Sequence, residues 1–270
     1  MNRIIFQVFF VGACVFFSGR TYSQDATREP LQGLDEMYLI MTPIEMFISD
    51  TPLGTATGFF FRSRDSGRTF LITNRHVVIN EKEQRFPDRL KLWLHLDRKD
   101  LRQNDYYDVA LYGDKERKQK RWTEINPDID VVAIELSNRD LEKFRISAFT
   151  STDFAPAGMQ VSIGEPVVII GYPEGFSDTL HNLPVSRQGA IASAFAIPFM
   201  GQPLFLVDAI LHKGTSGSPV ITRPDVTRIT TTGAQVFGRR FYLVGINSGS
   251  FGALNLNAIW FTSIIAELVK

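Results

Sequence analysis

Hydrophobic and polar positions follow one another in short runs along this chain, and the runs predict many β-strands. The clearest case is residues 89–96, where every second residue from Leu90 to Leu96 is leucine. A period of two over eight residues is typical of a strand with one buried face. Other apolar runs bounded by glycine, proline or polar clusters predict strands at 37–49, 54–61, 69–73, 106–112, 131–136, 165–171, 189–194, 204–209, 219–222 and 241–247. Short strands at this spacing are typical of β-barrels.

The stretches between these strands suggest how the chain is divided. Residues 137–159 have no clear period and contain Pro156-Ala157-Gly158, so we place the crossing between two domains, 37–150 and 151–270, in this stretch. Residues 24–36 are polar and are expected to be a flexible N-terminal segment. The charged run 114–121 predicts a solvated hairpin tip. Residues 257–269 carry apolar side chains at a helical spacing, which predicts a terminal helix.

Composition agrees with an all-β fold and narrows the range of partners. The 270 residues include 22 phenylalanines, 20 glycines and 13 prolines, which suits strands joined by many turns. The 29 basic and 29 acidic side chains cancel. A neutral chain gives no electrostatic reason to expect nucleic acid or an anionic membrane as a partner.

The first residues have the pattern of a signal peptide, which we place at 1–23. Arg3 supplies a positive start, residues 4–17 are mostly apolar, and Thr21-Tyr22-Ser23 is a suitable cleavage site. The apolar run is shorter than the roughly 20 residues of a spanning helix. An uncleaved anchor and lipidation of Cys14 are the alternatives. We expect an exported protein, periplasmic or secreted, with no membrane span in the mature chain; cleavage would also remove its single cysteine.

The strongest candidate for chemistry is the stretch 214–219, which reads Gly-Thr-Ser-Gly-Ser-Pro. Its glycines allow the backbone to turn sharply and to approach a ligand closely. Such a turn can expose the hydroxyl of Ser216 and direct the N–H groups of Gly214 and Ser216 at one point. That is the geometry of a nucleophile with an oxyanion hole. An ordinary polar turn is the alternative.

Two motifs upstream of this loop strengthen the catalytic interpretation. Residues 73–78, TNRHVV, place His76 at the end of an apolar run, and residues 128–134, DIDVVAI, place Asp130 before another. The chain order His, Asp, Ser is that of chymotrypsin rather than of subtilisin or the α/β-hydrolases. With the serine loop, these motifs resemble the trypsin-like serine proteases, most closely the branch that contains the bacterial periplasmic heat-shock proteases. The likeness extends from about Gly54 to Phe261.

The resemblance implies two six-stranded Greek-key β-barrels with a cleft between them. The first barrel would supply His76 as general base and Asp130 as the carboxylate that orients it, and the second would supply Ser216 as nucleophile. Asp130 is preferred because it directly precedes an apolar strand; Asp108 and then Asp128 are the rivals. The implied reaction is hydrolysis of a peptide bond in a polypeptide substrate through an acyl-enzyme, without metal or cofactor.

Further residues acquire roles only through the resemblance. Ile210 would form the floor of the primary pocket, which favours a small or apolar substrate side chain. Asn247, Ser248 and Gly249 would bind the substrate backbone as an added strand, with Ser248 also near the triad aspartate. Thr215 stands where animal trypsins have an aspartate that pairs with a new N-terminus, so activation by that route is not expected.

Three other functions have requirements that the sequence can be compared with. An α/β-hydrolase esterase would need Gly-x-Ser-x-Gly, and a metal hydrolase would need clustered histidine and acidic ligands such as HExxH; the sequence has neither. A non-catalytic member of the fold, acting as a binding or scaffold module, is the remaining alternative. The residues after Ser216 are too few for an added PDZ module, so none is expected.

Overall fold

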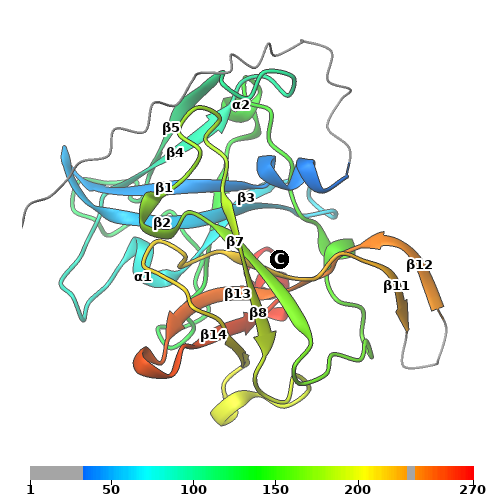
Figure 1. The fold of residues 1–270 in the computed structure, drawn as a ribbon. Helices are drawn as coiled ribbons and strands as arrows, with labels where there is room; N and C mark the ends of the chain where they lie inside the picture. The colour runs from blue at the N-terminus through cyan, green and yellow to red at the C-terminus, as the bar shows by residue number, and fades with distance from the viewer. Residues whose placement is uncertain (1–32, 230–234) are drawn as a thin grey trace, which may run out of the picture. The chain divides into compact units, whose positions relative to one another are not determined.

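The described part of the chain folds into two large β-sheets. The computed structural model describes residues 33–229 and 235–270 (Figure 1). The predicted signal peptide and the rest of the segment 1–32 lie outside these residues. One six-stranded sheet has the order β5-β4-β1-β2-β3-β6, and a closed barrel has the order β10-β13-β14-β9-β8-β7. The predicted all-β architecture is therefore confirmed.

The elements follow one another in chain order, and most match the predicted strands to within a few residues. The first sheet contains β1 (Met41–Ile48), β2 (Thr51–Arg62), β3 (Thr69–Thr73), β4 (Arg89–His95), β5 (Asn104–Ala110) and β6 (Val132–Leu136). The barrel contains β7 (Pro166–Gly171), β8 (Val185–Ile191), β9 (Leu204–Asp208), β10 (Pro219–Thr222), β13 (Leu243–Ser250) and β14 (Leu256–Phe261), and β11 (Asp225–Ile229) pairs with β12 (Gln235–Arg240) outside it. The helices are η1 (Gly33–Leu39), α1 (Arg75–Val78), α2 (Asn138–Leu141), η2 (Ser151–Asp153), η3 (Pro173–Gly175), η4 (Phe199–Gly201), η5 (Gly252–Leu254) and α3 (Ser263–Leu268).

The first sheet has two edges, β5 and β6, that are not paired with each other. Only single bridges, Tyr112 with Lys120 and Thr123 with Ala133, connect the chain between them. The charged run 114–121 lies in this connection, where the N–H of Gln119 donates to the carboxylate of Asp114. Because the run is polar, it has no apolar face with which a further strand could close the sheet.

Two segments differ from their predicted structure. The predicted helix 257–269 is divided into strand β14 and the short helix α3. β14 pairs with both β9 and β13, so burial inside the barrel outweighs the helical spacing of its apolar residues. Residues 33–36, expected to be flexible, belong to η1.

A shared hydrophobic core joins the two sheets. Phe59 and Phe61 of β2 are buried, and each packs against a ring from the connection between the sheets. The centroids of Phe59 and Phe149 are 5.6 Å apart and those of Phe61 and Phe154 are 5.4 Å apart. The same cluster includes Tyr172 of the second half. This packing fixes β2 against the barrel, where the loop containing Ser216 lies.

The described helices are all short. None is long and apolar enough to cross a membrane.

Candidate active site

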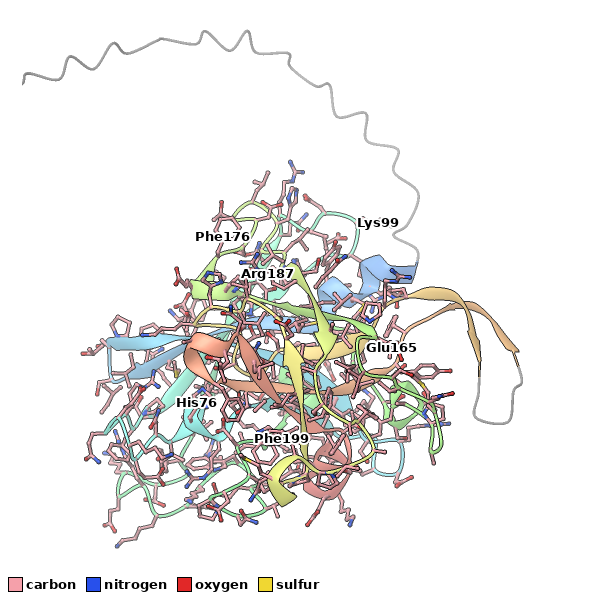
Figure 2. The ribbon with its side chains drawn as sticks, turned by 60° about the horizontal axis from the view of Figure 1, so that its bottom comes forward. His76, Lys99, Glu165, Phe176, Arg187 and Phe199 are labelled. Carbon is pink, nitrogen blue, oxygen red and sulfur yellow. The ribbon has the colours of Figure 1, made fainter. Side chains whose placement is uncertain are left out.

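His76 lies on the single turn α1, directly after β3 (labelled in Figure 2). Its backbone N–H donates to Asp130 Oδ1 at 2.9 Å, and its ring Nδ1 lies 2.7 Å from Asp130 Oδ2. The side chain of Asn74 donates to the backbone carbonyl of Asp130 at 2.7 Å. The carboxylate therefore binds both the backbone and the ring of His76, which fixes the orientation of the imidazole. Nε2 of His76 makes no hydrogen bond within the described residues.

Asp130 is held as a carboxylate against the effect of its burial. Burial favours the neutral acid, but the hydrogen bond and charge of His76 oppose it, together with the hydroxyl of Ser248, which donates to Oδ2 at 2.5 Å. The pKa of Asp130 lies below its ordinary value as a result. Ser248 thus has the contact that the resemblance implied.

The two rival aspartates are directed elsewhere. Asp108 lies on β5 and forms an exposed ion pair with Arg89 at 3.1 Å. Asp128 is exposed in a turn, where its N–H donates to the side chain of Asn126. Neither contacts His76, so the carboxylate bound to this histidine is that of Asp130.

Ser216 comes from the loop 209–218, between β9 and β10 of the barrel. Its hydroxyl donates to the backbone carbonyl of Ser248 at 3.2 Å and makes no hydrogen bond to His76. Ser248 therefore contacts Ser216 through its carbonyl and Asp130 through its hydroxyl. One residue of β13 joins the serine loop to the histidine–aspartate pair.

The backbone of the serine loop is held by its carbonyl groups. Four successive carbonyls accept hydrogen bonds: Lys213 O from Glu174 N at 2.5 Å, Gly214 O from Thr57 Oγ1 at 2.8 Å, Thr215 O from Asn247 Nδ2 at 2.8 Å, and Ser216 O from Thr57 N at 2.9 Å. The N–H groups of Gly214 and Ser216 have no partner among the described residues. Two free amide donors in a segment whose four carbonyls, Lys213 to Ser216, are occupied form a site suited to a negative charge.

The remaining predicted residues belong to this loop or to β13, which pairs with β10 directly after it. Ile210 is 66% exposed, and a side chain added at Gly249 would meet open space. Asn247 is only 2% exposed and binds Thr215, so its side chain supports the serine loop and does not face a substrate. Successive side chains of a strand point to opposite faces, so the side chain of Ser248 points away from that of Asn247. Binding of a substrate backbone by residues 247–249 stays a prediction. The hydroxyl of Thr215 donates to His212 O at 2.7 Å.

Two residues of the site were missed from the sequence. Thr57 is a fully buried polar residue in the apolar strand β2, and Arg75 is a buried charge next to His76. Arg75 Nη2 lies 2.8 Å from Glu81, and its Nε lies 2.9 Å from Glu124. The hydrogen bond from Arg75 lowers the pKa of the Glu81 carboxyl to about 2. The sequence carries no pattern that marks either position, because both residues have polar or glycine neighbours.

Charged side chains of the kind that bind metals are dispersed. No group of three or more histidine, cysteine, aspartate or glutamate residues in the described ranges is arranged to hold a metal ion.

The fold and site together define a class of protein. A sheet that supplies a carboxylate-bound histidine and a barrel that supplies a serine on a glycine loop are the architecture of the chymotrypsin-like serine peptidases. Residues 56–228 match the family model described as the trypsin-like peptidase domain. The match covers more than half of the chain, which therefore belongs to this family.

Solved structures support the fold. A serine endoprotease from Yersinia pestis aligns with a TM-score of 0.50 and 15% identity over 89% of this chain and 66% of its own. The HtrA-type protease AlgW, solved with a tripeptide, aligns with a TM-score of 0.50 and 14% identity over 85% of this chain and 58% of its own. This chain thus spans about three fifths to two thirds of the length of these two proteins. A search of curated proteins finds no match.

Gly217 provides a test of how closely the serine loop approaches β2. Its φ is +83°, and a Cβ would lie 2.2 Å from the carbonyl oxygen of Thr57. Gly217→Ala should lower the free energy of unfolding by about 2–5 kcal/mol, from backbone strain and the clash together. Gly67 is the control, because its φ is +67° but nothing lies within 4 Å. Gly67→Ala should cost only about 1–2 kcal/mol in urea unfolding; equal costs would contradict the proposed clash.

Arg75 should contribute more to stability than an exposed arginine. Arg75→Met leaves the carboxylates of Glu81 and Glu124 without their partner at a partly buried site. Because Glu81 is itself half-exposed, we expect the free energy of unfolding to fall by about 2–4 kcal/mol. Arg68→Met, which removes an exposed pair with Glu135, should cost less than about 1 kcal/mol.

The decrease in the free energy of unfolding caused by Arg75→Met should also depend on pH. The lowered pKa of Glu81 means that the pair stabilises the fold above pH 4.5 and that this contribution is lost as the pH falls toward about 2. Urea unfolding of Arg75→Met and of the parent protein should therefore converge over that interval. A difference that stays constant would show that Glu81 is not the group involved.

Proposed function

We propose that this protein is an exported serine endopeptidase that hydrolyses peptide bonds through the triad His76, Asp130 and Ser216. The observation that carries the proposal is the carboxylate of Asp130, which binds the backbone N–H and the ring Nδ1 of His76 and the hydroxyl of Ser248, a residue that also contacts Ser216. A carboxylate at Nδ1 selects the tautomer whose Nε2 can accept a proton and stabilises the imidazolium that follows.

The reaction requires the hydroxyl of Ser216 to change its hydrogen-bond partner. The hydroxyl of Ser216 leaves its 3.2 Å contact with the carbonyl of Ser248, a long and therefore weak hydrogen bond, and turns toward Nε2 of His76. Catalytic hydrogen bonds are often absent before substrate binds. Ser216 Oγ then attacks the substrate carbonyl while its proton passes to His76. His76 returns the proton to the leaving amine as the C–N bond breaks, and water hydrolyses the acyl-enzyme by the same route.

The free amides of Gly214 and Ser216 are proposed as the oxyanion hole. The developing negative charge on the carbonyl oxygen would bind these two donors, which are already separated from competing acceptors. The N–H of Glu174 donates to the carbonyl of Lys213 at 2.5 Å, so that this carbonyl is occupied and does not compete for the two donors. These contacts favour an oxyanion loop that is formed before substrate arrives, without the ion pair that Thr215 cannot make.

The surroundings of the loop favour an extended substrate with an apolar side chain. Ile210 offers no charge to a lysine or arginine, and Gly249 leaves its strand open for a peptide backbone. Directly after β13, the ring centroids of Phe251 and Phe199 (labelled in Figure 2) lie 6.4 Å apart and add an apolar surface next to this strand. The apolar leader expected at residues 1–23 supports export. A binding module without catalysis is the alternative, and the unbonded Ser216–His76 pair is the feature that favours it.

Removing the nucleophile separates these two functions. Ser216→Ala should lower the hydrolysis rate of a fluorogenic peptide or of labelled casein by roughly a millionfold, because the triad acts as a unit. A fluorophosphonate should label the parent protein at Ser216 and should not label the variant. An unlabelled, inactive but folded parent would favour the scaffold function.

The role of Asp130 has a matched control in its former rival. Asp130→Asn should lower kcat by about ten-thousandfold, since an amide stabilises the wrong tautomer of His76. Asp108→Asn removes a carboxylate from the same sheet, and its exposed pair with Arg89 predicts nearly unchanged activity. Similar rates for the two variants would remove Asp130 from the mechanism.

A further inference from the structure

Thr57 lies where the first sheet meets the serine loop. It belongs to β2 and is fully buried. The neighbouring strand β3 ends at Thr73, so the backbone of Thr57 has no strand partner on that side beyond the hydroxyl of Thr73, which donates to Thr57 O at 2.9 Å. Its N–H donates to the carbonyl of Ser216 at 2.9 Å. The serine loop therefore takes the place at which β3 would have continued.

The hydroxyl of Thr57 makes two further contacts, in opposite senses. It donates to the carbonyl of Gly214 at 2.8 Å and accepts from the N–H of Tyr172 at 3.0 Å. A hydroxyl can donate and accept at once, and among side chains of this size only serine and threonine provide one. One buried oxygen thus links β2, the serine loop and the segment after β7.

These contacts restrain the two peptide groups on either side of Gly214. The hydroxyl of Thr57 donates to the carbonyl of Gly214, which belongs to the peptide group after this residue. The N–H of Glu174 donates to the carbonyl of Lys213, which belongs to the peptide group before it. Glu174 is two residues from Tyr172, so Thr57 also anchors the segment that presents this N–H. Glycine turns readily to either sign of φ, and Gly214, at +87°, needs such restraints to keep its amide directed at a ligand.

The surroundings leave no room for a substitute. An added Cβ would lie 2.7 Å from Thr57 Oγ1 at Gly171 and 2.2 Å from Thr57 O at Gly217. A water molecule that replaced the hydroxyl would need comparable space and several polar partners. The packing therefore makes the hydroxyl itself the link.

We infer that Thr57 is a positioning residue of the peptidase: its hydroxyl holds the amide of Gly214 in the orientation that stabilises the oxyanion. This role rests on the proposed function. Thr57 does not touch the substrate, so its loss should lower the rate of acylation more than it weakens binding.

The test compares Thr57→Val with Thr57→Ser. Valine keeps the shape but leaves the carbonyl of Gly214 and the N–H of Tyr172 without a partner, and we expect kcat to fall by about 10- to 100-fold with KM changed less than about threefold. Fluorophosphonate labelling of Ser216 should slow in proportion. Serine restores the hydroxyl and should keep kcat within about threefold of the parent.

Thr222→Val is the matched control. Thr222 is also fully buried, and its hydroxyl accepts from the N–H of Tyr242 at 2.9 Å on β10, outside the oxyanion loop. It should lose a similar amount of thermal stability but keep its kcat. If both valine variants lose activity in proportion to stability, or if Thr57→Val keeps the parent kcat, the role of Thr57 is refuted. Should Thr57→Val fail to fold, Thr57→Cys, a weak donor of similar size, should give an intermediate loss, and parent-like rates would refute the role.

Amide hydrogen exchange tests the role of Thr57 without relying on catalytic activity, so its result is independent of the proposed function. In Thr57→Val, the backbone amides of residues 172–176 and 217–218 should exchange on the order of tenfold faster than in the parent, because their hydrogen bonds lose an anchor. Unchanged exchange would show that the hydroxyl does not hold the loop. A parent that fluorophosphonate does not label would refute the proposed function alone, while the exchange result would still decide whether Thr57 positions the loop.

Discussion

The site depends on one constraint: the carbonyl groups from Lys213 to Ser216 are all occupied, whereas the N–H groups of Gly214 and Ser216 are free among the described residues. A backbone segment has equal numbers of donors and acceptors, and a loop left to itself would satisfy both with its own atoms or with water. Here the framework binds the carbonyls from Lys213 to Ser216 and leaves the amides of Gly214 and Ser216 unpaired. The free donors of the loop are therefore a consequence of what surrounds it.

A second balance concerns the charge of Asp130. Burial would neutralise the carboxyl, whereas His76 and Ser248 stabilise its charged form, and the second effect is larger. The contacts come from different parts of the chain: His76 from α1 and Ser248 from β13 of the barrel. The packing of the sheet against the barrel thus adds the Ser248 hydrogen bond to the larger effect of His76 on the pKa of Asp130. Folding and the electrostatics of the proposed triad are coupled through the aromatic core that joins the two sheets.

Membership of the trypsin-like family coexists with about 15% identity to the aligned structures. Such low identity is compatible with a shared fold because the constraints are few and local. The fold needs apolar faces on its strands and glycine where a loop meets backbone, as at Gly217. In this chain the turn that carries His76 is also anchored by the ion pairs of Arg75 with Glu81 and Glu124.

The sequence by itself determined the strands, the order of the motifs and the identity of Ser216 and His76 as candidates. These follow from period, turn residues and short motifs, which are local properties of the chain. Only the tertiary structure showed that Asp130, and neither Asp108 nor Asp128, contacts His76, and that the side chain of Asn247 binds the serine loop. It also divided the expected terminal helix into β14 and α3. It also placed Thr57, 157 residues before Gly214 in sequence, within hydrogen-bond distance of that residue. Contacts of this kind join segments that are far apart in the sequence. The local pattern of one segment does not indicate its partner, so tertiary packing determines the contact.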